Sequence, residues 1–359
     1  MKAAVCRAFG QPLVIEDVTL APPRKGEITV RLAACAICHS DIAYADGRWR
    51  GPLPAIYGHE ASGTVTSTGD GVTEFAPGDR VLATLIWSCG GCPACASGDP
   101  TCCHHAWEAR PSPLTGGAGE TIVRGLNTAA FAEACVVDQS QCIKLPDDIA
   151  MDVASLLSCG VITGVGAVTN TAKLRTGSTC AVIGAGGVGL NTIQGARLMG
   201  ASRIVALDLT QEKLATAREF GATDGIIASA PDVPGQVRAL TGGIGVDYVF
   251  VAVGAPAAFQ SAPDLLAPGG AVVMVGMTGD DDEVTYNPVD IAIVNRSLLG
   301  SRMGRTVLRR DVPWLIEMYR QNRLKLDELI TGRYPLEKIN EAMAETRAGN
   351  ARRNVIVFD

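Results

Sequence analysis

The sequence has no excess of positive charge. Its 359 residues include 31 lysines and arginines against 37 aspartates and glutamates, which gives a net charge of −6. Nucleic-acid-binding proteins neutralise phosphates with basic patches or stripes, and this chain contains no such run. The composition therefore argues against nucleic acid as a partner.

Long apolar runs are also missing. Glycine and polar residues interrupt every apolar segment before it reaches the roughly 20 residues that a membrane-spanning helix needs. The opening residues Met1–Arg7 lack the continuous apolar region of a signal peptide. These absences predict a cytoplasmic protein without a membrane partner. Hydrophobic residues still make up 47% of the chain, enough for the cores of roughly two domains of about 100–200 residues each.

The pattern of the sequence changes along the chain. Up to about residue 160, Gly and Pro break short β-runs, which predicts an irregular, mostly-β domain. Examples of these runs are Glu27–Leu32, Gly63–Ser67 and Arg80–Leu85. Beyond residue 300, a helix over Asp311–Asn322 and a strand over Asn354–Phe358 are expected to return to this first domain.

Between these parts, strands and helices alternate, which predicts parallel βαβ units. The expected elements are strands over Thr179–Ile183, Arg203–Leu207, Asp247–Val253 and Ala271–Val275, with a helix over Gly187–Met199. The run Gly184–Gly189 reads G-x-G-x-x-G between the first strand and the helix, and Asp208 ends the second strand. Such a turn lets a pyrophosphate approach the helix N-terminus, while the acid accepts bonds from the ribose hydroxyls and favours NAD over NADP. A packing turn with a solvated aspartate is the alternative.

Five of the twelve cysteines crowd into one short stretch: Cys89, Cys92, Cys95, Cys102 and Cys103. In a long chain without a secretory signal, clustered cysteines favour a metal site over disulfides. The spacing C-x2-C-x2-C-x7-C from Cys89 to Cys103 fits a closed tetrahedral zinc site of the structural type. Cys102 is adjacent to Cys103, and only one of the two can be the fourth ligand. A chance run of buried thiols is the alternative.

Three separate pieces could form a second, open zinc site: Cys38-His39-Ser40-Asp41, Gly58-His59-Glu60 and Cys159. Two thiolates and an imidazole leave the fourth zinc position open for water or a substrate. Each piece alone is a weak signal, because a buried cysteine usually acts as a small hydrophobic residue and a buried histidine can be a satisfied core residue. Their value comes from occurring together with the cysteine cluster and the glycine-rich turn.

Together these motifs resemble the zinc-containing medium-chain alcohol dehydrogenase family over essentially the whole chain. The family signature G-H-E-x2-G-x5-G-x2-V is met from Gly58 through Gly63 and Gly69 to Val72. The resemblance implies an α/β fold in which a GroES-like, mostly-β catalytic domain covers residues 1–160 with a structural zinc lobe at 88–104. A doubly wound parallel Rossmann domain would cover 161–300 and bind NAD, and 301–359 would return to the catalytic domain. It also implies a homodimer, with a tetramer as the alternative.

The resemblance assigns roles to the residues of the open site. Three residues match the catalytic zinc ligands: Cys38, His59 and Cys159. Glu60 matches a carboxylate beside the metal, which is an alternate ligand. Asp41 matches the acid that orients His59, and Ser40 matches the hydroxyl that takes the proton of the alcohol. The structural zinc ligands would be Cys89, Cys92, Cys95 and Cys103.

The resemblance also implies cofactor and substrate contacts. The cofactor positions are His39, Gly184, Gly186, Gly187, Val188, Gly189, Asp208, Lys213, Val253, Met277 and Arg353. Among them, His39 and Arg353 match residues near the pyrophosphate, while Asp208 and Lys213 flank the adenosine ribose. The substrate pocket is expected to contain Leu85, Trp107, Gly125, Leu126 and Met277.

Two features depart from the family pattern. Some relatives place a histidine at the outer end of the proton relay, where this chain has Ala43, so the relay would end in water or in a group such as Tyr44. The Cys-His-Ser-Asp opening and the C-terminal segment resemble the class III, glutathione-dependent formaldehyde dehydrogenase branch. Its acidic pair near Gly47–Trp49 is missing, and Arg48 and Arg50 stand there instead.

The predicted function is therefore that of an NAD-dependent zinc alcohol dehydrogenase with two zinc ions per chain and a small-molecule alcohol or aldehyde as substrate. Gly125 stands where relatives often have an aromatic residue, which predicts a wide channel and medium-length or aromatic alcohols over ethanol. Arg48 and Arg302 favour a substrate with a carboxylate, unless both are solvated surface residues. The alternatives are a thiol-dependent formaldehyde dehydrogenase and an NAD-binding protein without activity, which would be expected to lose its catalytic ligands.

Overall fold

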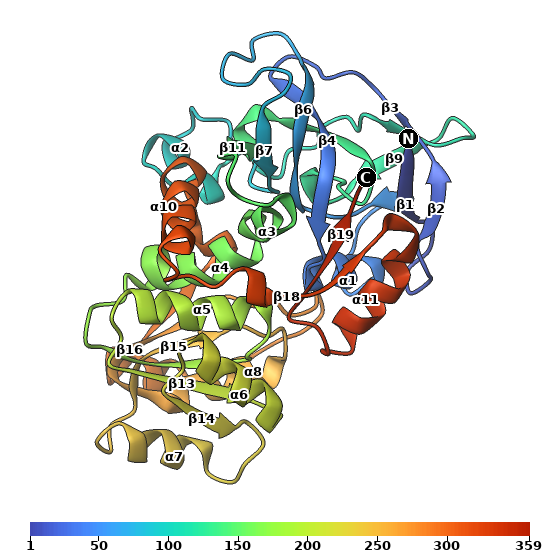
Figure 1. The fold of residues 1–359 in the computed structure, drawn as a ribbon. Coiled ribbons are helices and arrows are strands. Elements are labelled where there is room, and N and C mark those ends of the chain that lie inside the picture. The colour runs from blue at the N-terminus through green and yellow to red at the C-terminus, as the bar shows by residue number, and fades with distance from the viewer. The chain divides into compact units, whose positions relative to one another are not determined.

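Figure 1 shows the computed structural model, which describes residues 1–359. The chain divides into two compact units. The first unit comprises Met1–Gly160, Val307–Tyr319 and Leu326–Asp359, and the second unit comprises Val161–Thr306 and Arg320–Lys325.

The first unit is built on two sheets. One has the strand order β2-β1-β5-β9-β8-β3. Its strands are β1 (Lys2–Cys6), β2 (Val14–Asp17), β3 (Thr19–Leu20), β5 (Ala55–Ile56), β8 (Leu114–Thr115) and β9 (Thr121–Arg124). The other has the order β11-β7-β6-β4-β19-β18, with β10 also paired to β4. Its strands are β4 (Glu27–Ala36), β6 (Glu60–Thr68), β7 (Arg80–Ala83), β10 (Ala134–Asp138), β11 (Cys142–Lys144), β18 (Ile330–Tyr334) and β19 (Arg353–Val357).

Strands from the early part and from the last part of the chain pair in this second sheet. In Figure 1 the red strand β19 lies beside the blue strand β4, and Ile356 is the antiparallel partner of Cys35. The helices of the unit are α1 (His39–Ala45), α2 (Pro93–Ala96), α3 (Met151–Ser155), α10 (Leu308–Arg320) and α11 (Ile339–Arg347). A mostly apolar core that includes Ile28, Leu32 and Phe131 fills the interior. The predicted mostly-β domain is confirmed.

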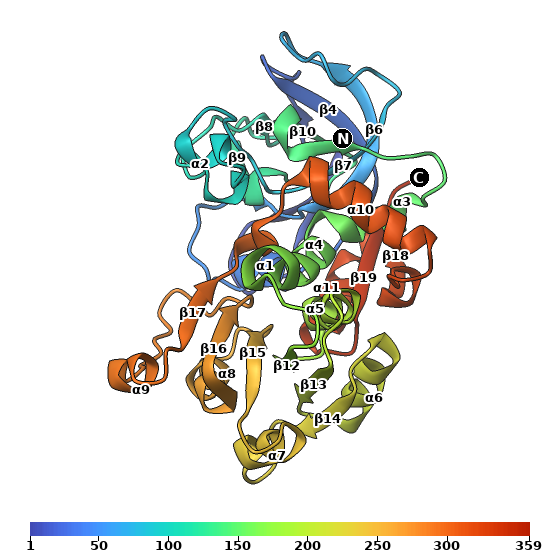
Figure 2. The ribbon, with the colours of Figure 1, turned by 90° about the vertical axis from the view of Figure 1, so that its left-hand side faces the viewer.

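The second unit contains one parallel sheet with the strand order β14-β13-β12-β15-β16-β17. The strands are β12 (Thr179–Ile183), β13 (Arg203–Asp208), β14 (Asp224–Ile227), β15 (Val246–Val251), β16 (Leu266–Met274) and β17 (Ser297–Gly300). The helices are α4 (Gly160–Gly166), α5 (Gly187–Leu198), α6 (Gln211–Phe220), α7 (Val233–Leu240), α8 (Pro256–Ser261) and α9 (Pro288–Ala292). Figure 2 shows the strands side by side with helices packed against them. This order is that of the doubly wound dinucleotide-binding fold, which confirms the predicted fold class.

Local sequence explains where the elements of this sheet begin and end. Helix α6 starts where the Thr210 hydroxyl accepts a hydrogen bond from the Lys213 amide at 3.3 Å. It ends at Phe220, because the C-cap Gly221 has a φ of 117°. Helix α5 ends at Leu198, with Met199 as its C-cap, one residue before the predicted end. Strand β15 ends at Val251, so Val253 lies beyond the strand in which it was predicted.

No single helix is long and apolar enough to cross a membrane. One bent pair of helices, Met151–Ser158 with Gly160–Ala172, has the length and the composition for a span, and these two properties are the only support for one.

Candidate active site and metal centres

The carboxylate of Asp41 organises the first cluster. Cys38 is the N-cap of α1, and its backbone amide donates to Asp41 Oδ2 at 3.0 Å. The other oxygen, Oδ1, accepts from the Gly58 amide at 2.9 Å and lies 3.0 Å from His59 Nδ1. Asp41 is completely buried, so all of these bonds form away from water. One side chain thus fixes the start of α1 and the Gly58–His59 segment relative to each other.

Four ligand-type side chains converge next to Asp41. One atom from each of Cys38, His59, Glu60 and Cys159 lies within 4.8 Å of the others, and all four residues are buried. Because Asp41 holds Nδ1 of His59, the remaining ring nitrogen, Nε2, has no hydrogen-bond partner in the protein. An unpaired buried imidazole nitrogen beside two sulfurs fits a bound metal ion, and a carboxylate on the other ring nitrogen is the usual partner of a metal-ligating histidine. The residues fit zinc.

The electrostatics of this cluster favour a cation. Burial by itself would lower the pKa of His59, but the Asp41 carboxylate and the Cys38 sulfur outweigh it and raise that pKa well above its usual value. The Cys159 thiol and His59 hold the pKa of Cys38 well below its usual value, in spite of burial. Both shifts favour charge on the ligand-type atoms, a thiolate on Cys38 among them, and a thiolate is the form in which cysteine binds a metal ion.

Glu60 has an arginine partner that the sequence did not indicate. Arg353 Nη1 lies 3.2 Å from Glu60 Oε1 and donates to the Ile37 carbonyl oxygen at 3.2 Å. Burial raises the pKa of Glu60 to about 8, and Arg353 only partly offsets this. Sequence reasoning had placed Arg353 near the cofactor pyrophosphate. No local sequence signal reveals its pairing with Glu60, because the contact depends on the position of β19 beside β4.

The segment that carries Cys159 is anchored by its neighbour. The Thr84 hydroxyl donates to the Ser158 carbonyl oxygen at 2.5 Å, and the Ser158 hydroxyl donates to the Ala61 carbonyl oxygen at 3.0 Å. These bonds join Cys159 to β6 and to the end of β7. Hydrogen bonds of the preceding residue thus help to position the Cys159 sulfur.

The second cluster is the cysteine-rich lobe. The sulfurs of Cys89, Cys92, Cys95 and Cys103 lie within 4.8 Å of one another. The Cys92 amide donates to Cys89 Sγ at 3.3 Å, and the Cys89 amide donates to Cys103 Sγ at 3.4 Å. Cys103 is buried and belongs to the group, whereas Cys102 is exposed and does not. The structure therefore favours Cys103 as the fourth ligand.

Backbone amides stabilise charge on some of these sulfurs. Bonds from the Cys95 and His104 amides lower the pKa of Cys92 to about 6, and bonds from the Gly91 and Cys92 amides lower the pKa of Cys89. Burial instead raises the pKa of Cys95 to about 12. Thiols gathered this closely cannot all ionise without a cation between them, so the lobe fits a closed zinc site with four sulfur ligands.

The glycine-rich turn of the second unit has the geometry needed for a pyrophosphate. Gly184 has a φ of 96°, and Gly186 is the N-cap of α5 with no side chain over the helix N-terminus. A Cβ on Gly189 would overlap the carbonyl oxygen of Gly184, so only glycine allows the helix to start this close to β12. A methyl group of Val253 contacts the other side of Gly184, which brings that predicted residue to the turn.

Asp208 is tied to the same turn. Its Oδ2 accepts from the Ala185 amide at 2.7 Å, and its Oδ1 accepts from the Leu209 amide at 2.7 Å. Lys213 Nζ lies 3.9 Å from Oδ1. Asp208 therefore both stabilises the turn and places negative charge at the end of β13, with the Lys213 ammonium group beside it.

The remaining predicted residues are distributed as follows. Ser40 Oγ lies 3.7 Å from Cys38 Sγ. Leu85 and Leu126 lie in adjacent segments, because Asn127 Nδ2 donates to the Leu85 carbonyl oxygen at 3.5 Å. In contrast, Trp107 is 78% exposed and Met277 is 65% exposed. His39 is the first residue of α1.

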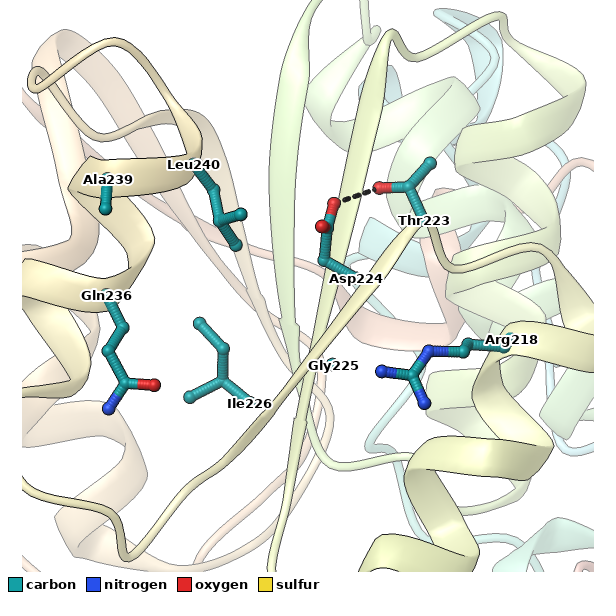
Figure 3. Close-up of a pocket in the computed structure, with 8 residues that line it drawn as sticks. All are labelled: Arg218, Thr223, Asp224, Gly225, Ile226, Gln236, Ala239 and Leu240. Carbon is teal, nitrogen blue, oxygen red and sulfur yellow. Dashed lines mark hydrogen bonds between the residues drawn. The ribbon is translucent and has the colours of Figure 1, made fainter.

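A hollow of about 400 Å³ lies elsewhere in the second unit, beside the edge strand β14 (Figure 3). It is lined by Arg218, Thr223, Asp224, Gly225, Ile226, Gln236, Ala239 and Leu240. The Thr223 hydroxyl donates to Asp224 at 2.6 Å, and Arg203 also pairs with that carboxylate at 2.9 Å. None of the predicted site residues lines this hollow.

Replacing Asp41 with asparagine is expected to weaken zinc binding at the first cluster by about 10–100-fold. The variant keeps the size of the side chain but loses the charge and one acceptor oxygen, so Cys38, Gly58 and His59 can no longer all be held. Competition with a chelator followed by metal analysis measures the change. Asp46→Asn, which alters a partly exposed pair with Arg347 at the other end of α1, is the control. Unchanged zinc retention in Asp41→Asn would contradict the role of Asp41.

Comparison with known proteins agrees with these two units. Residues 24–147 match the alcohol dehydrogenase GroES-like domain family, and residues 187–321 match the zinc-binding dehydrogenase family. The chain is 35% identical to a class-P alcohol dehydrogenase of Arabidopsis thaliana, over 99% of this chain and 97% of the relative.

Solved structures are similar over the whole chain. An alcohol dehydrogenase zinc-binding domain protein of Burkholderia ambifaria has a TM-score of 0.95 at 33% identity, covering 100% of this chain and 98% of that one. A benzyl alcohol dehydrogenase of Acinetobacter calcoaceticus has a TM-score of 0.93 at 27% identity, covering 100% of this chain and 99% of that one. The protein therefore belongs to the zinc-binding alcohol dehydrogenase family, and it is an oxidoreductase whose cofactors are zinc and NAD.

Proposed function

We propose that this protein interconverts a medium-length or aromatic alcohol and its aldehyde or ketone, with NAD as the hydride acceptor. The observation that carries the proposal is the buried cluster of Cys38, His59 and Cys159 beside the Ser40 hydroxyl. The Ser40 hydroxyl lies 3.7 Å from the Cys38 sulfur, which provides a proton acceptor beside the cluster. The three residues are proposed as ligands, and Glu60 as an alternate ligand.

Each residue of the cluster has a distinct task in this proposal. Zinc, when bound, supplies a Lewis acid that lowers the pKa of the alcohol hydroxyl toward neutrality. Ser40 accepts the proton of the alcohol and passes it to water or to a group such as Tyr44, because Ala43 cannot accept a proton. Asp41 keeps His59 in the tautomer that presents Nε2. Burial of these groups excludes water, so charge that develops at the substrate oxygen interacts strongly with them.

The proposed cofactor contacts come from the second unit. The Gly184–Gly189 turn would bind the pyrophosphate and Asp208 the ribose, as dinucleotide folds of this strand order do. Val253, Lys213 and Met277 are proposed as further contacts, and His39 and Arg353 keep their proposed role near the pyrophosphate. We further propose a cytoplasmic homodimer.

The substrate preference is tested with a panel of alcohols. A relative with 27% identity is a benzyl alcohol dehydrogenase, which supports aromatic substrates here. We expect hexanol and benzyl alcohol to exceed ethanol in kcat/KM by about tenfold or more, since each buried methylene contributes roughly 1 kcal/mol to binding. A panel in which ethanol is the best substrate would refute this preference.

A thiol-dependent formaldehyde dehydrogenase is the second candidate, and the Cys-His-Ser-Asp opening at residue 38 supports it. Against it, Arg48 and Arg50 stand where that branch has acidic residues. Formaldehyde oxidation measured with and without glutathione separates the two. Activity that requires the thiol would replace the first proposal.

We expect kcat/KM with NAD to exceed that with NADP by roughly a hundredfold. The 2′-phosphate of NADP would be repelled by the Asp208 carboxylate, and it would replace the ribose hydroxyl that donates a hydrogen bond to this carboxylate in NAD. Asp208→Ser should narrow this gap by about tenfold or more. The substitution removes the repulsion of the 2′-phosphate. It also removes the carboxylate that lies 3.9 Å from Lys213 Nζ, so that Lys213 can pair with a phosphate instead. NAD use should also fall, since the Ala185 amide loses its acceptor. Asp224→Ser, at the start of β14, is the control, and equal use of both cofactors by the unmodified enzyme would contradict the prediction.

A further inference from the structure

Three aromatic side chains form a cluster near the start of α1. The rings of Tyr44 and Tyr57 stack with centroids 5.6 Å apart and planes 22° apart. The Trp49 ring meets Tyr44 edge-on, with centroids 5.3 Å apart and planes at 83°. Tyr57 is only 3% exposed, whereas Tyr44 and Trp49 are partly exposed. Tyr57 therefore lies behind Tyr44, and Trp49 supports the Tyr44 ring from the side.

A glycine makes room for the Tyr57 ring. Strands β5 and β9 pair in parallel with Ile56 opposite Arg124, so Tyr57 and Gly125 follow at the same level. A Cβ on Gly125 would lie 2.5 Å from Tyr57 Cδ1 and 2.5 Å from the Ile56 carbonyl oxygen. No side chain could stand at position 125 unless both the ring and the strand moved. The space beside Gly125 is therefore occupied by Tyr57 and not left open for a ligand.

This cluster lies close to the residues that handle the alcohol. Ser40 and Tyr44 are four residues apart on α1, so they lie on the same face, one turn from each other. Tyr57 precedes the proposed ligand His59 by two residues, and the Asp41 carboxylate holds both segments through Cys38, Gly58 and His59. A substrate whose hydroxyl reaches Ser40 would extend past the Tyr44 ring.

We propose that Tyr44, backed by Tyr57, is the specificity-determining wall of the substrate site and that it selects flat aromatic alcohols. This inference rests on the proposed function, because it assumes that the alcohol hydroxyl is bound at Ser40. A planar ring can stack on Tyr44 at the usual centroid separation, whereas a puckered ring of the same size cannot. Stacking of this kind changes affinity by about three- to tenfold beyond the area that is buried.

Benzyl alcohol and cyclohexylmethanol form a matched pair for the test, because they share a carbon skeleton and differ in the flatness of the ring. The measured quantity is the ratio of their kcat/KM values, compared between the zinc-loaded unmodified enzyme and each variant. This comparison cancels the different intrinsic reactivities of the two alcohols. We expect Tyr44→Leu to lower the ratio by about three- to tenfold. Tyr57→Leu should lower the ratio less, because the Tyr44 ring stays in place and loses only the Tyr57 ring stacked behind it.

Two variants serve as controls. Tyr57→Phe keeps the ring and removes a hydroxyl that has no hydrogen-bond partner in the protein, so it should leave the ratio unchanged. Tyr248→Leu removes a ring stacked on Phe250 in the second unit and should also leave the ratio unchanged. If Tyr57→Leu fails to fold, Tyr44→Leu and Tyr57→Phe still decide the question. An unchanged ratio in folded, zinc-containing Tyr44→Leu would overturn the proposal, as would a loss of selectivity in Tyr57→Phe.

Equilibrium binding separates this inference from the proposed function. Calorimetry with the same two alcohols on the zinc-loaded enzyme measures the preference of the wall without turnover. One outcome is that the unmodified enzyme oxidises neither alcohol but binds benzyl alcohol more tightly than cyclohexylmethanol, and that Tyr44→Leu abolishes this difference. This outcome would support the role of Tyr44 and refute the proposed activity. If turnover occurs and neither the binding preference nor the kcat/KM ratio depends on Tyr44, the activity stands and the wall is refuted.

Discussion

Replacing Cys159 with alanine is expected to reduce kcat/KM by about 10³-fold or more while leaving the protein folded. The Lewis-acid contribution of a bound metal amounts to several kcal/mol, and about 1.4 kcal/mol corresponds to a factor of ten in rate. Folding should be largely preserved, because hydrogen bonds of Thr84 and Ser158 hold the backbone of this segment. The measurement is steady-state kinetics with the preferred alcohol, together with zinc analysis and a thermal melt.

Cys135→Ala is the matched control, since it removes a buried sulfur from the same unit but from neither cluster. It should lose a little stability and keep both its zinc content and its activity. Full turnover by Cys159→Ala with one zinc ion missing would show that the reaction does not depend on this cluster. Unfolding of Cys159→Ala alone would instead assign the cluster a structural role.

Features encoded in short segments were predictable from the sequence. Strand β12 has the predicted bounds, and the glycine-rich turn lies between it and α5, because the conformation of Gly184 and the close contact at Gly189 are local requirements. The cysteine lobe could also be predicted from the sequence, since its four grouped cysteines lie within 15 residues of one another. The three pieces of the first cluster are dispersed and each alone was a weak signal. Their occurrence together with the cysteine lobe and the glycine-rich turn, and then the family resemblance, indicated that they would meet.

Contacts set by strand register were not predictable. The pairing of Arg353 with Glu60 depends on β19 lying beside β4, and nothing near residue 353 indicates an acid partner. The position of Tyr57 shows the same difficulty. Sequence comparison suggested that Gly125 would widen the channel, but the parallel pairing of β5 with β9 places the Tyr57 ring against it. A missing side chain does not by itself imply an open space, because protein interiors are close-packed.

Replacing Cys103 with alanine is expected to lower the zinc content from two ions per chain to one and to reduce the melting temperature by roughly 10 °C. The adjacent Cys102→Ala should change neither quantity, since Cys102 lies outside the sulfur group and is exposed. The two variants remove the same atom from neighbouring positions, so the comparison isolates metal binding from the loss of a thiol. Cys92→Ala should behave like Cys103→Ala. Metal analysis and a thermal melt on all three proteins provide the measurement.

The size of this effect follows from how little else holds the lobe together. Its own buried core consists of Cys92, Cys103 and Ala106, with a few partly buried neighbours such as Trp87. Its one α-helix, α2, has four residues, too few for a stable helix in isolation. A segment that buries so little apolar surface cannot offset the entropy of ordering its chain, so the metal–sulfur bonds must supply the difference. Loss of one ligand should therefore release the zinc and unfold the lobe, whereas a lobe that stays ordered with one zinc per chain would show that backbone and packing suffice.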